Sequence, residues 1–183
     1  MKLALVTHAE RPKLRGTLPD LWPEFMGHDP VVQGFWPQLY DLYPDFQLWV
    51  VDREAGPRRA VGYACSVPVG WNGNPSPRGI DWALTDGVEA EPTTLCTIVA
   101  GLVPQYRGFG IAAAILQRLA AIAAGHGLDA LVAPVRPTWK ERIRSSHSIG
   151  TRAGAAPTVS RTTRGCAPTS GSAASLSRLL LGR

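Results

Sequence analysis

The chain has 183 residues, of which 45% are hydrophobic, and this is enough for one domain with a buried core. Its three cysteines and four histidines are scattered without metal-ligand spacing, so we expect no metal site and a reducing compartment. No apolar run is long enough to span a membrane, and the first residues lack the pattern of a signal peptide, so the sequence predicts a cytoplasmic protein.

The net charge of +5 is concentrated at one end of the chain. Residues 1–135 carry 10 Lys and Arg against 13 Asp and Glu, a net charge of −3, whereas residues 136–183 carry 9 against Glu141 alone, a net charge of +8. Because the positive charge lies outside the segments with a globular pattern, it does not indicate a nucleic-acid surface on the folded part. We therefore expect neither nucleic acid nor a membrane among the partners.

An apolar segment at residues 3–7 predicts a short strand near the N-terminus. Residues 17–45 then carry large apolar side chains at loose helical spacing, with Pro30 at a break, which predicts two short helices in succession. These side chains are Leu21, Trp22, Phe25, Phe35, Trp36, Leu39, Tyr40 and Tyr43. We expect them to pack in the core, and the alternative that some of them wall a ligand pocket stays open.

Three strongly apolar segments predict the central strands, at residues 46–51, 60–69 and 93–103. Gly101, inside the third of them, predicts a β-bulge or a close approach of another group to the backbone. An alanine-rich and isoleucine-rich segment at residues 111–124 predicts a helix buried against the sheet, and residues 130–135 predict the next strand.

The junction between the third of these strands and the helix has an unusual composition. It contains Gly108 and Gly110 and lacks the Ser, Thr, Asp or Asn that usually caps a helix N-terminus. The free backbone N–H groups, the positive end of the helix dipole and the absence of glycine side chains together favour an anion. The pattern predicts a phosphate or pyrophosphate cradle, and the alternative is a glycine turn that binds nothing.

Two familiar phosphate-binding patterns fail at this junction. The dinucleotide fingerprint requires a glycine at Ala113, and the P-loop requires Lys and Ser or Thr directly after Gly110. The arrangement Gln105-x-x-Gly108-x-Gly110, preceded by Pro104 and with Arg107 before the first glycine, resembles motif A of the GNAT superfamily of acyl-CoA-dependent N-acyltransferases. The resemblance extends to the strand before the motif and to the helix and strand after it.

This resemblance implies an α/β (α+β) fold with a mixed, mostly antiparallel sheet flanked by helices, whose C-terminal part is missing or disordered here. It implies acetyl-CoA as the acyl donor, with its pyrophosphate on the backbone amides of residues 107–112 and its pantetheine arm along residues 100–102, where one N–H polarises the thioester carbonyl. The implied cofactor-binding residues are Ala100, Gly101, Leu102, Gln105, Arg107, Gly108, Phe109, Gly110, Ile111 and Ala112.

The implied function is an N-acetyltransferase acting on a small-molecule or peptide amine, which attacks after losing a proton to a carboxylate or a water chain. The candidate carboxylates near the key strand, in a stretch without an assigned element, are Asp81, Asp86, Glu89 and Glu91, and a surface role is commoner for each. The family often uses a tyrosine from a later helix as the acid, but no tyrosine follows Tyr106, so the catalytic residues stay unassigned.

Two alternative functions stay open, a non-catalytic acyl-CoA-binding remnant and a nucleotide-binding module unrelated to CoA. The family resemblance also implies a possible homodimer, because related proteins often pair through their C-terminal strands.

The tail at residues 143–183 differs from the rest of the chain. It contains no Asp, Glu, Phe, Tyr or Trp, and its only apolar cluster lies at residues 176–181. Such a composition can bury little surface, so we expect a GNAT-like domain at residues 1–142 followed by a disordered tail.

A frameshift would explain the tail. When it is back-translated with GC-rich codons and read from each third base, residues 149–152 give R-Y-A-G and residues 157–171 give D-G-L-P-Y-D-P-W-L-R-A-H-E-R-L. The second run resembles the downstream sequence of actinobacterial GNAT proteins. The alternative is a natural disordered tail.

Overall fold

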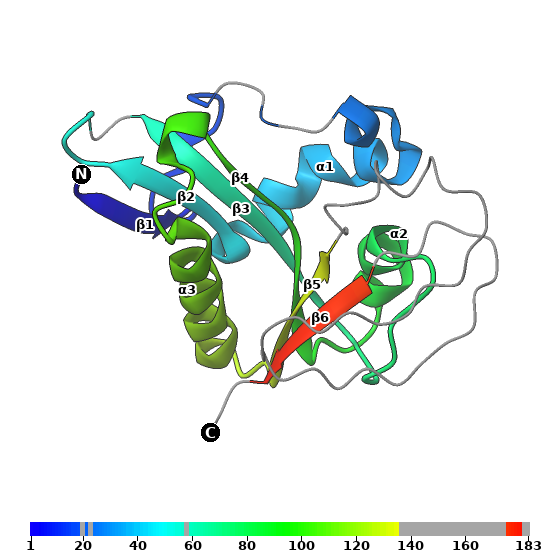
Figure 1. The fold of residues 1–183 in the computed structure, drawn as a ribbon. Helices are drawn as coiled ribbons and strands as arrows, with labels where there is room; N and C mark the ends of the chain where they lie inside the picture. The colour runs from blue at the N-terminus through cyan, green and yellow to red at the C-terminus, as the bar shows by residue number, and fades with distance from the viewer. Residues whose placement is uncertain (19–20, 22–23, 57–58, 136–174, 181–183) are drawn as a thin grey trace, which may run out of the picture.

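The computed structural model describes residues 1–18, 21, 24–56, 59–135 and 175–180. Its centre is one six-stranded sheet in which the strands lie side by side in chain order (Figure 1). The strands are β1 (Leu3–Thr7), β2 (Gln47–Asp52), β3 (Ala60–Val69), β4 (Thr94–Leu102), β5 (Ala130–Val135) and β6 (Ser175–Leu180). Every neighbouring pair is antiparallel except β4 and β5, which run parallel.

Among the described residues, three α-helices accompany the sheet, α1 (Pro30–Leu42), the one-turn α2 (Ile80–Trp82) and α3 (Ile111–Gly125). Helix α3 is the crossover that a parallel pair such as β4 and β5 requires. A π-turn at Ala83–Gly87 continues α2, and a 3₁₀ turn at Pro104–Tyr106 lies between β4 and α3. Within the described ranges, no helix has both the length and the apolar composition needed to cross a bilayer.

The helices cover opposite faces of the sheet (Figure 1). Helix α3 presents one apolar stripe to the first face, made of Ile111, Ile115, Leu119 and Ile122. Helix α1 and the π-turn cover the second face, where Leu39, Tyr40 and Leu84 pack against Trp49 and Val67. Strands β2 and β3 are buried along almost their whole length because both faces above them are covered.

Local chemistry sets where the helices begin and end. The Asp29 carboxylate accepts the backbone N–H groups of Val31 at 2.9 Å and Val32 at 3.1 Å, so α1 starts with a satisfied cap. At the C-terminal end of α3, Gly127 adopts φ of 75°, in the left-handed region that favours glycine. The Leu128 N–H then donates to the Ala123 carbonyl at 2.9 Å and turns the chain toward β5.

The structure confirms the predicted strands and the α3 helix, with ends that differ by at most one residue. For residues 17–45 it shows a short 3₁₀ helix at Glu24–His28 and then α1, and Pro30 is the first residue of α1. The unassigned stretch around Asp81 becomes α2 and the π-turn.

The structure differs from the expected disordered tail in one place. Within residues 143–183 it describes Ser175–Leu180, and these form β6, antiparallel to β5 from Ala130↔Leu180 to Val135↔Ser175. The physical reason is that β5 offers an open backbone edge and the apolar cluster at residues 176–181 supplies a segment that can pair with it. Residues 149–171, on which the frameshift hypothesis depends, lie outside the described residues, so the domain division at residue 142 stays a prediction.

Candidate functional site

Strand β4 has two different halves. Its first residues pair on both sides, with β3 and with β5, but the pairing with β5 covers only Thr94↔Ala130, Leu95↔Leu131 and Cys96↔Val132. The pairing with β3 continues to Leu102, whereas β5 goes on to pair with β6 alone. Residues 97–102 therefore expose one backbone edge that has no strand partner among the described residues (Figure 1).

A β-bulge lies at the start of this open edge. Cys65 is opposite Val99, but the next residue, Ser66, is opposite Thr97, so Ile98 is the extra residue on β4. A bulge bends its strand and re-aims its backbone groups, and bulges are frequent next to functional sites. The bulge therefore changes the direction of the β4 backbone at residues 97–99, directly after the last residue of β4 that pairs with β5.

Gly101 serves a different purpose from the bulge. A Cβ atom added there would lie 2.8 Å from Cε1 of Tyr63 and 3.4 Å from Cβ of Leu21, so the residue has no room for a side chain. Of the two alternatives predicted for Gly101, the structure therefore shows the close approach, and the bulge lies three residues earlier.

The turn that follows β4 depends on glycine for its backbone conformation. Gly108 has φ of 85° and Gly110 has φ of 74°, both in the left-handed region, while a Cβ atom at either position would meet nothing within 4 Å. Gly110 is also the N-cap residue of α3 and supplies no side-chain cap. The glycines are thus required by the turn and leave the space above it open.

The backbone N–H groups of this turn are available to a ligand. In the described part of the chain, no acceptor receives the N–H groups of residues 108–112, whereas Ala113 and Ala114 already donate to the Gly110 carbonyl. Free N–H groups at the positive end of a helix, here one of 15 residues, are the donors that an anion site requires. The geometry therefore supports the predicted cradle, with residues 108–112 as its donors.

The residues expected to bind the cofactor form one continuous strip from the open edge of β4 to the first turn of α3. Ala100, Gln105, Arg107, Gly108, Phe109, Gly110 and Ala112 are exposed, and Gly101 and Leu102 are half-buried. Ile111 differs, because its side chain is only 5% exposed and packs in the core beneath α3, so it can offer a ligand only its backbone. The Leu102 carbonyl already accepts Nε–H of Arg107 at 3.2 Å.

A hydrogen bond that no sequence pattern signals links this strip to the sheet. The Tyr106 hydroxyl donates to Oδ2 of Asp52 at 3.2 Å, and Asp52 is the last residue of β2. The backbone N–H of Glu54, which also donates to this carboxylate, is the main cause that lowers the pKa of Asp52. Burial and the adjacent carboxylate raise the pKa of Tyr106, so its hydroxyl stays protonated as a donor.

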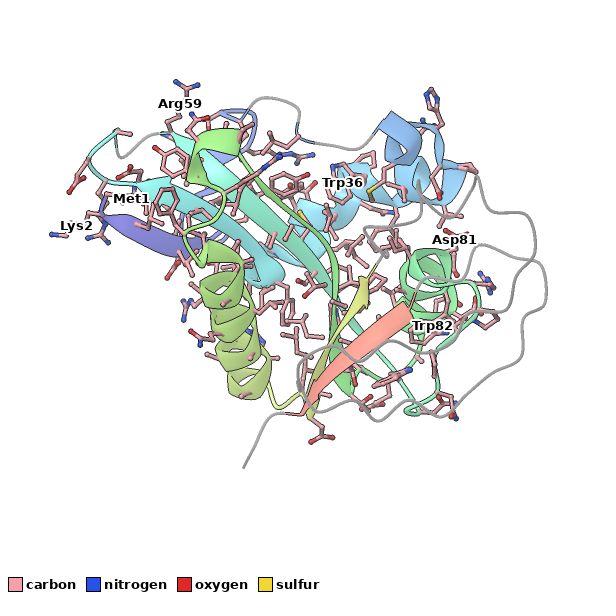
Figure 2. All side chains as sticks on the ribbon, viewed as in Figure 1. Met1, Lys2, Trp36, Arg59, Asp81 and Trp82 are labelled. Carbon is pink, nitrogen blue, oxygen red and sulfur yellow. The ribbon has the colours of Figure 1, made fainter. Side chains whose placement is uncertain are left out.

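The four candidate carboxylates are not equivalent. Asp86 is exposed and pairs with Nη1 of Arg78 at 2.7 Å, and Glu89 and Glu91 are also exposed, as expected for surface residues. Asp81 is half-buried on α2, where burial and the nearby Asp29 raise its pKa. Figure 2 shows Asp81 and Trp82 on α2, and Trp36 on α1.

The aromatic residues of the N-terminal third pack mainly in the core. The Tyr40 ring stacks on Trp49 with centroids 5.6 Å apart and meets the edge of His8 at 5.0 Å. Trp36 is half-buried and meets Tyr40 edge-on. Burial and the charge of Arg15 lower the pKa of His8, so this ring is neutral at neutral pH. Trp22 lies outside the described residues.

Two cavities lie away from the cradle, around the loop at residues 70–77 and the first residues of β4. Their volumes are about 350 and 280 Å³. The larger one is bounded by Trp82 and Asp86 and the smaller one by Thr94 and Asp129. They do not touch the strip at residues 100–112.

The chain is similar in sequence to a curated enzyme. No protein-family model matches the chain. Arginine N-acetyltransferase avaD from Aspergillus versicolor is 33% identical in an alignment of 157 positions that covers 75% of this chain and 54% of that protein. The chain therefore spans about half the length of this curated relative.

The fold of the chain is similar to that of several solved structures. The loading GNATL domain of CurA from Lyngbya majuscula matches with a TM-score of 0.60 at 12% identity, over 80% of this chain and 71% of that one. The GphF GNAT-like decarboxylase in complex with isobutyryl-CoA matches with a TM-score of 0.56 at 13% identity, over 79% and 71%. The chain thus has a GNAT-like fold, and the predicted mixed, mostly antiparallel sheet flanked by helices is confirmed.

Proposed function

We propose that this protein is an N-acetyltransferase that transfers an acetyl group from acetyl-CoA to an amine. The observation that carries the proposal is the continuity of two open features, the unpaired edge of β4 at residues 97–102 and the unoccupied N–H groups of residues 108–112. An extended amide chain can add to an open strand edge, and a pyrophosphate suits a helix N-terminus. Acyl-CoA contains an extended amide chain, the pantetheine arm, followed by a pyrophosphate, in the same order as the two open features.

Each part of the site has a distinct task in this proposal. The amides of residues 108–112 hold the pyrophosphate, and Arg107, the exposed residue before them, donates its Nε–H to the Leu102 carbonyl. The pantetheine arm lies along residues 100–102 toward the bulge at Ile98, and an N–H in this segment donates to the thioester oxygen as negative charge develops there. Because backbone groups make most of the contacts with acyl-CoA in this proposal, the side chains of these residues mainly hold the backbone in position.

We propose arginine or a related cationic amine as the acceptor. The supporting observation is the similarity to a protein named as an arginine N-acetyltransferase. Asp81 is our candidate for the proton acceptor, because it is half-buried on α2 whereas the other three candidate carboxylates are exposed, and this burial raises its pKa.

The test is an assay of free thiol release from acetyl-CoA with arginine, lysine, ornithine and a peptide N-terminus as acceptors. We expect turnover with at least one amine, fastest with arginine, and thermal stabilisation of the protein by CoA alone. Stabilisation without turnover would instead indicate a non-catalytic acyl-CoA-binding protein. Failure of acetyl-CoA to stabilise or react would contradict the proposal as a whole.

Four further expectations belong to the same proposal. We infer that the chain is related to actinobacterial GNAT proteins, that the sequence after residue 142 reflects a frameshift, that the protein acts in the cytoplasm, and that it assembles as a homodimer. The change of composition at the tail supports the frameshift. Sequencing fresh genomic DNA across the codons for Arg142 and Ile143 tests the frameshift, and an unchanged reading frame would reject it.

A further inference from the structure

The Asp52 carboxylate lies where three segments of the chain meet. Its Oδ1 atom accepts the backbone N–H of Glu54 at 3.0 Å and of Lys2 at 3.3 Å, and its Oδ2 atom accepts the Tyr106 hydroxyl at 3.2 Å. The residue is only 6% exposed. One carboxylate therefore joins the start of β1, the turn after β2 and the 3₁₀ turn that precedes the cradle (Figure 2 shows Lys2 beside β1).

The cradle is held mainly at its two ends. After Tyr106 the N–H groups of residues 108–112 have no acceptor in the described part of the chain, and the two glycines are the residues with the greatest backbone freedom. At the far end, the buried Ile111 side chain fixes the start of α3. At the near end, the Tyr106 ring packs against the core beneath α3 and its hydroxyl is fixed by Asp52.

We propose that Asp52 is a positioning residue for acyl-CoA binding, which holds Tyr106 and through it keeps the glycine turn in the conformation that presents its N–H groups to the pyrophosphate. The inference rests on the proposed function. The physical reason is that only molecules in the binding-competent conformation bind the ligand. The apparent affinity therefore falls in proportion to the fraction of molecules in that conformation.

A neutral partner should hold Tyr106 as well as the carboxylate does. Asp52→Asn keeps one oxygen for the backbone N–H groups of Lys2 and Glu54, and its amide nitrogen can donate to the Tyr106 hydroxyl oxygen. The substitution also removes a negative charge near the anion site. We therefore expect Asp52→Asn to bind CoA at least as tightly as the wild type. Asp52→Ala removes the acceptor and should weaken binding, and Tyr106→Phe removes the donor and should weaken it to the same degree.

The first experiment is isothermal titration of the full chain with CoA. A hydrogen bond to a charged group corresponds to a change of about tenfold or more in an equilibrium constant, so we expect Tyr106→Phe and Asp52→Ala each to raise the Kd about tenfold. The double variant should be no weaker than Asp52→Ala, because both changes break the same bond. Tyr43→Phe is the matched control, since no described residue bonds to its hydroxyl, and it should leave the Kd unchanged.

The second experiment does not require a ligand. Amide hydrogen exchange of the free protein should be faster in Tyr106→Phe than in the wild type at the hydrogen-bonded amides that flank the glycines, those of residues 106, 107, 113 and 114, with unchanged exchange in the middle of α3. Unchanged exchange at these four amides, or a Kd equal to that of Tyr43→Phe, would overturn the inference even if Asp52→Ala does not fold.

A wild-type chain that does not bind CoA would instead contradict the proposed function, and the inference about CoA binding with it. The failure of the proposed function and the failure of the inference about Asp52 can be told apart. If the wild type binds CoA, the proposed function stands, and the affinities of the variants then test the role of Asp52. In an active protein, Tyr106→Phe should raise the KM for acetyl-CoA and leave kcat nearly unchanged, as expected for a group that acts on binding alone.

Discussion

The two long helices begin in opposite ways. Helix α1 starts with Pro30 behind Asp29, whose carboxylate accepts two of the N–H groups of the first turn. Helix α3 starts with Gly110 in a left-handed conformation, and the N–H groups of residues 108–112 remain unoccupied in the described part of the chain. A capped start contributes to stability, whereas an uncapped and exposed start provides a binding site. The same backbone groups therefore have a structural role in one helix and a proposed functional role in the other.

The largest expected effect comes from filling the open start of α3. Gly108→Glu places a bulky carboxylate in the space reserved for the pyrophosphate and forces a non-glycine residue to φ of 85°. We expect CoA binding to be abolished in isothermal titration. The matched control is Gly125→Glu at the other end of α3, where no strained φ is required and an added Cβ meets open space. Equal affinity of the Gly108→Glu variant and the wild type would show that the anion site is elsewhere.

Adding only a charge to the same turn should have an intermediate effect. Asp and Asn have similar shapes and both tolerate the left-handed conformation of Gly110 better than other residues. We expect Gly110→Asp to bind CoA about tenfold more weakly than Gly110→Asn, because only the carboxylate repels the pyrophosphate. The comparison of the two Kd values separates charge from bulk. If both variants bound equally, the site would not act through its electrostatic potential.

Removing the cap of α1 should affect stability and not binding. Asp29→Ala leaves the N–H groups of Val31 and Val32 without their acceptor and should lower the free energy of unfolding by about 1 kcal/mol. Urea denaturation measures this change, and Asp29→Ser, which restores a capping oxygen, should recover most of it. The CoA Kd should stay within twofold of the wild type. A large change in Kd would mean that the two helix starts are not independent.

The smallest expected effect is the pH dependence contributed by Asp52. Its pKa is lowered in the folded state, chiefly because the Glu54 N–H donates to the charged form. The carboxylate therefore contributes stability above the ordinary aspartate pKa, near 4, and loses it as the pH falls through its lower folded value. We expect the wild type to lose more stability between pH 7 and pH 3 than Asp52→Asn does. Parallel urea curves at the two pH values for both proteins would contradict this assignment.

The glycine turn and the uncapped start of α3 could be predicted from the sequence because all of their determinants are local. Gly108, Gly110 and the absence of a capping residue lie within a few positions of each other, between a strand and a helix with clear periodicity. The bulge at Ile98 could not be located, because its position is set by how β4 pairs with β3. The bond from Tyr106 to Asp52 joins residues 54 positions apart, and no spacing rule signals it.

Two other features could not be predicted from the sequence because they depend on tertiary contacts. The stretch around Asp81 has no clear helical or strand period, and it becomes helical because Ala83 and Leu84 pack in the core between β3 and α1. Strand β6 lies in a segment whose composition predicts disorder, and its pairing is determined by the edge of β5.

The most direct test of the acyl-CoA site is a titration of ¹⁵N-labelled protein with CoA, followed by the backbone amide resonances. We expect the largest chemical-shift changes at residues 108–112, smaller changes along residues 97–102, and none at the capped start of α1. Shifts confined to the loop at residues 70–77 and its cavities, with the amides of residues 108–112 unmoved, would contradict the assignment of the open start of α3 as the cofactor site.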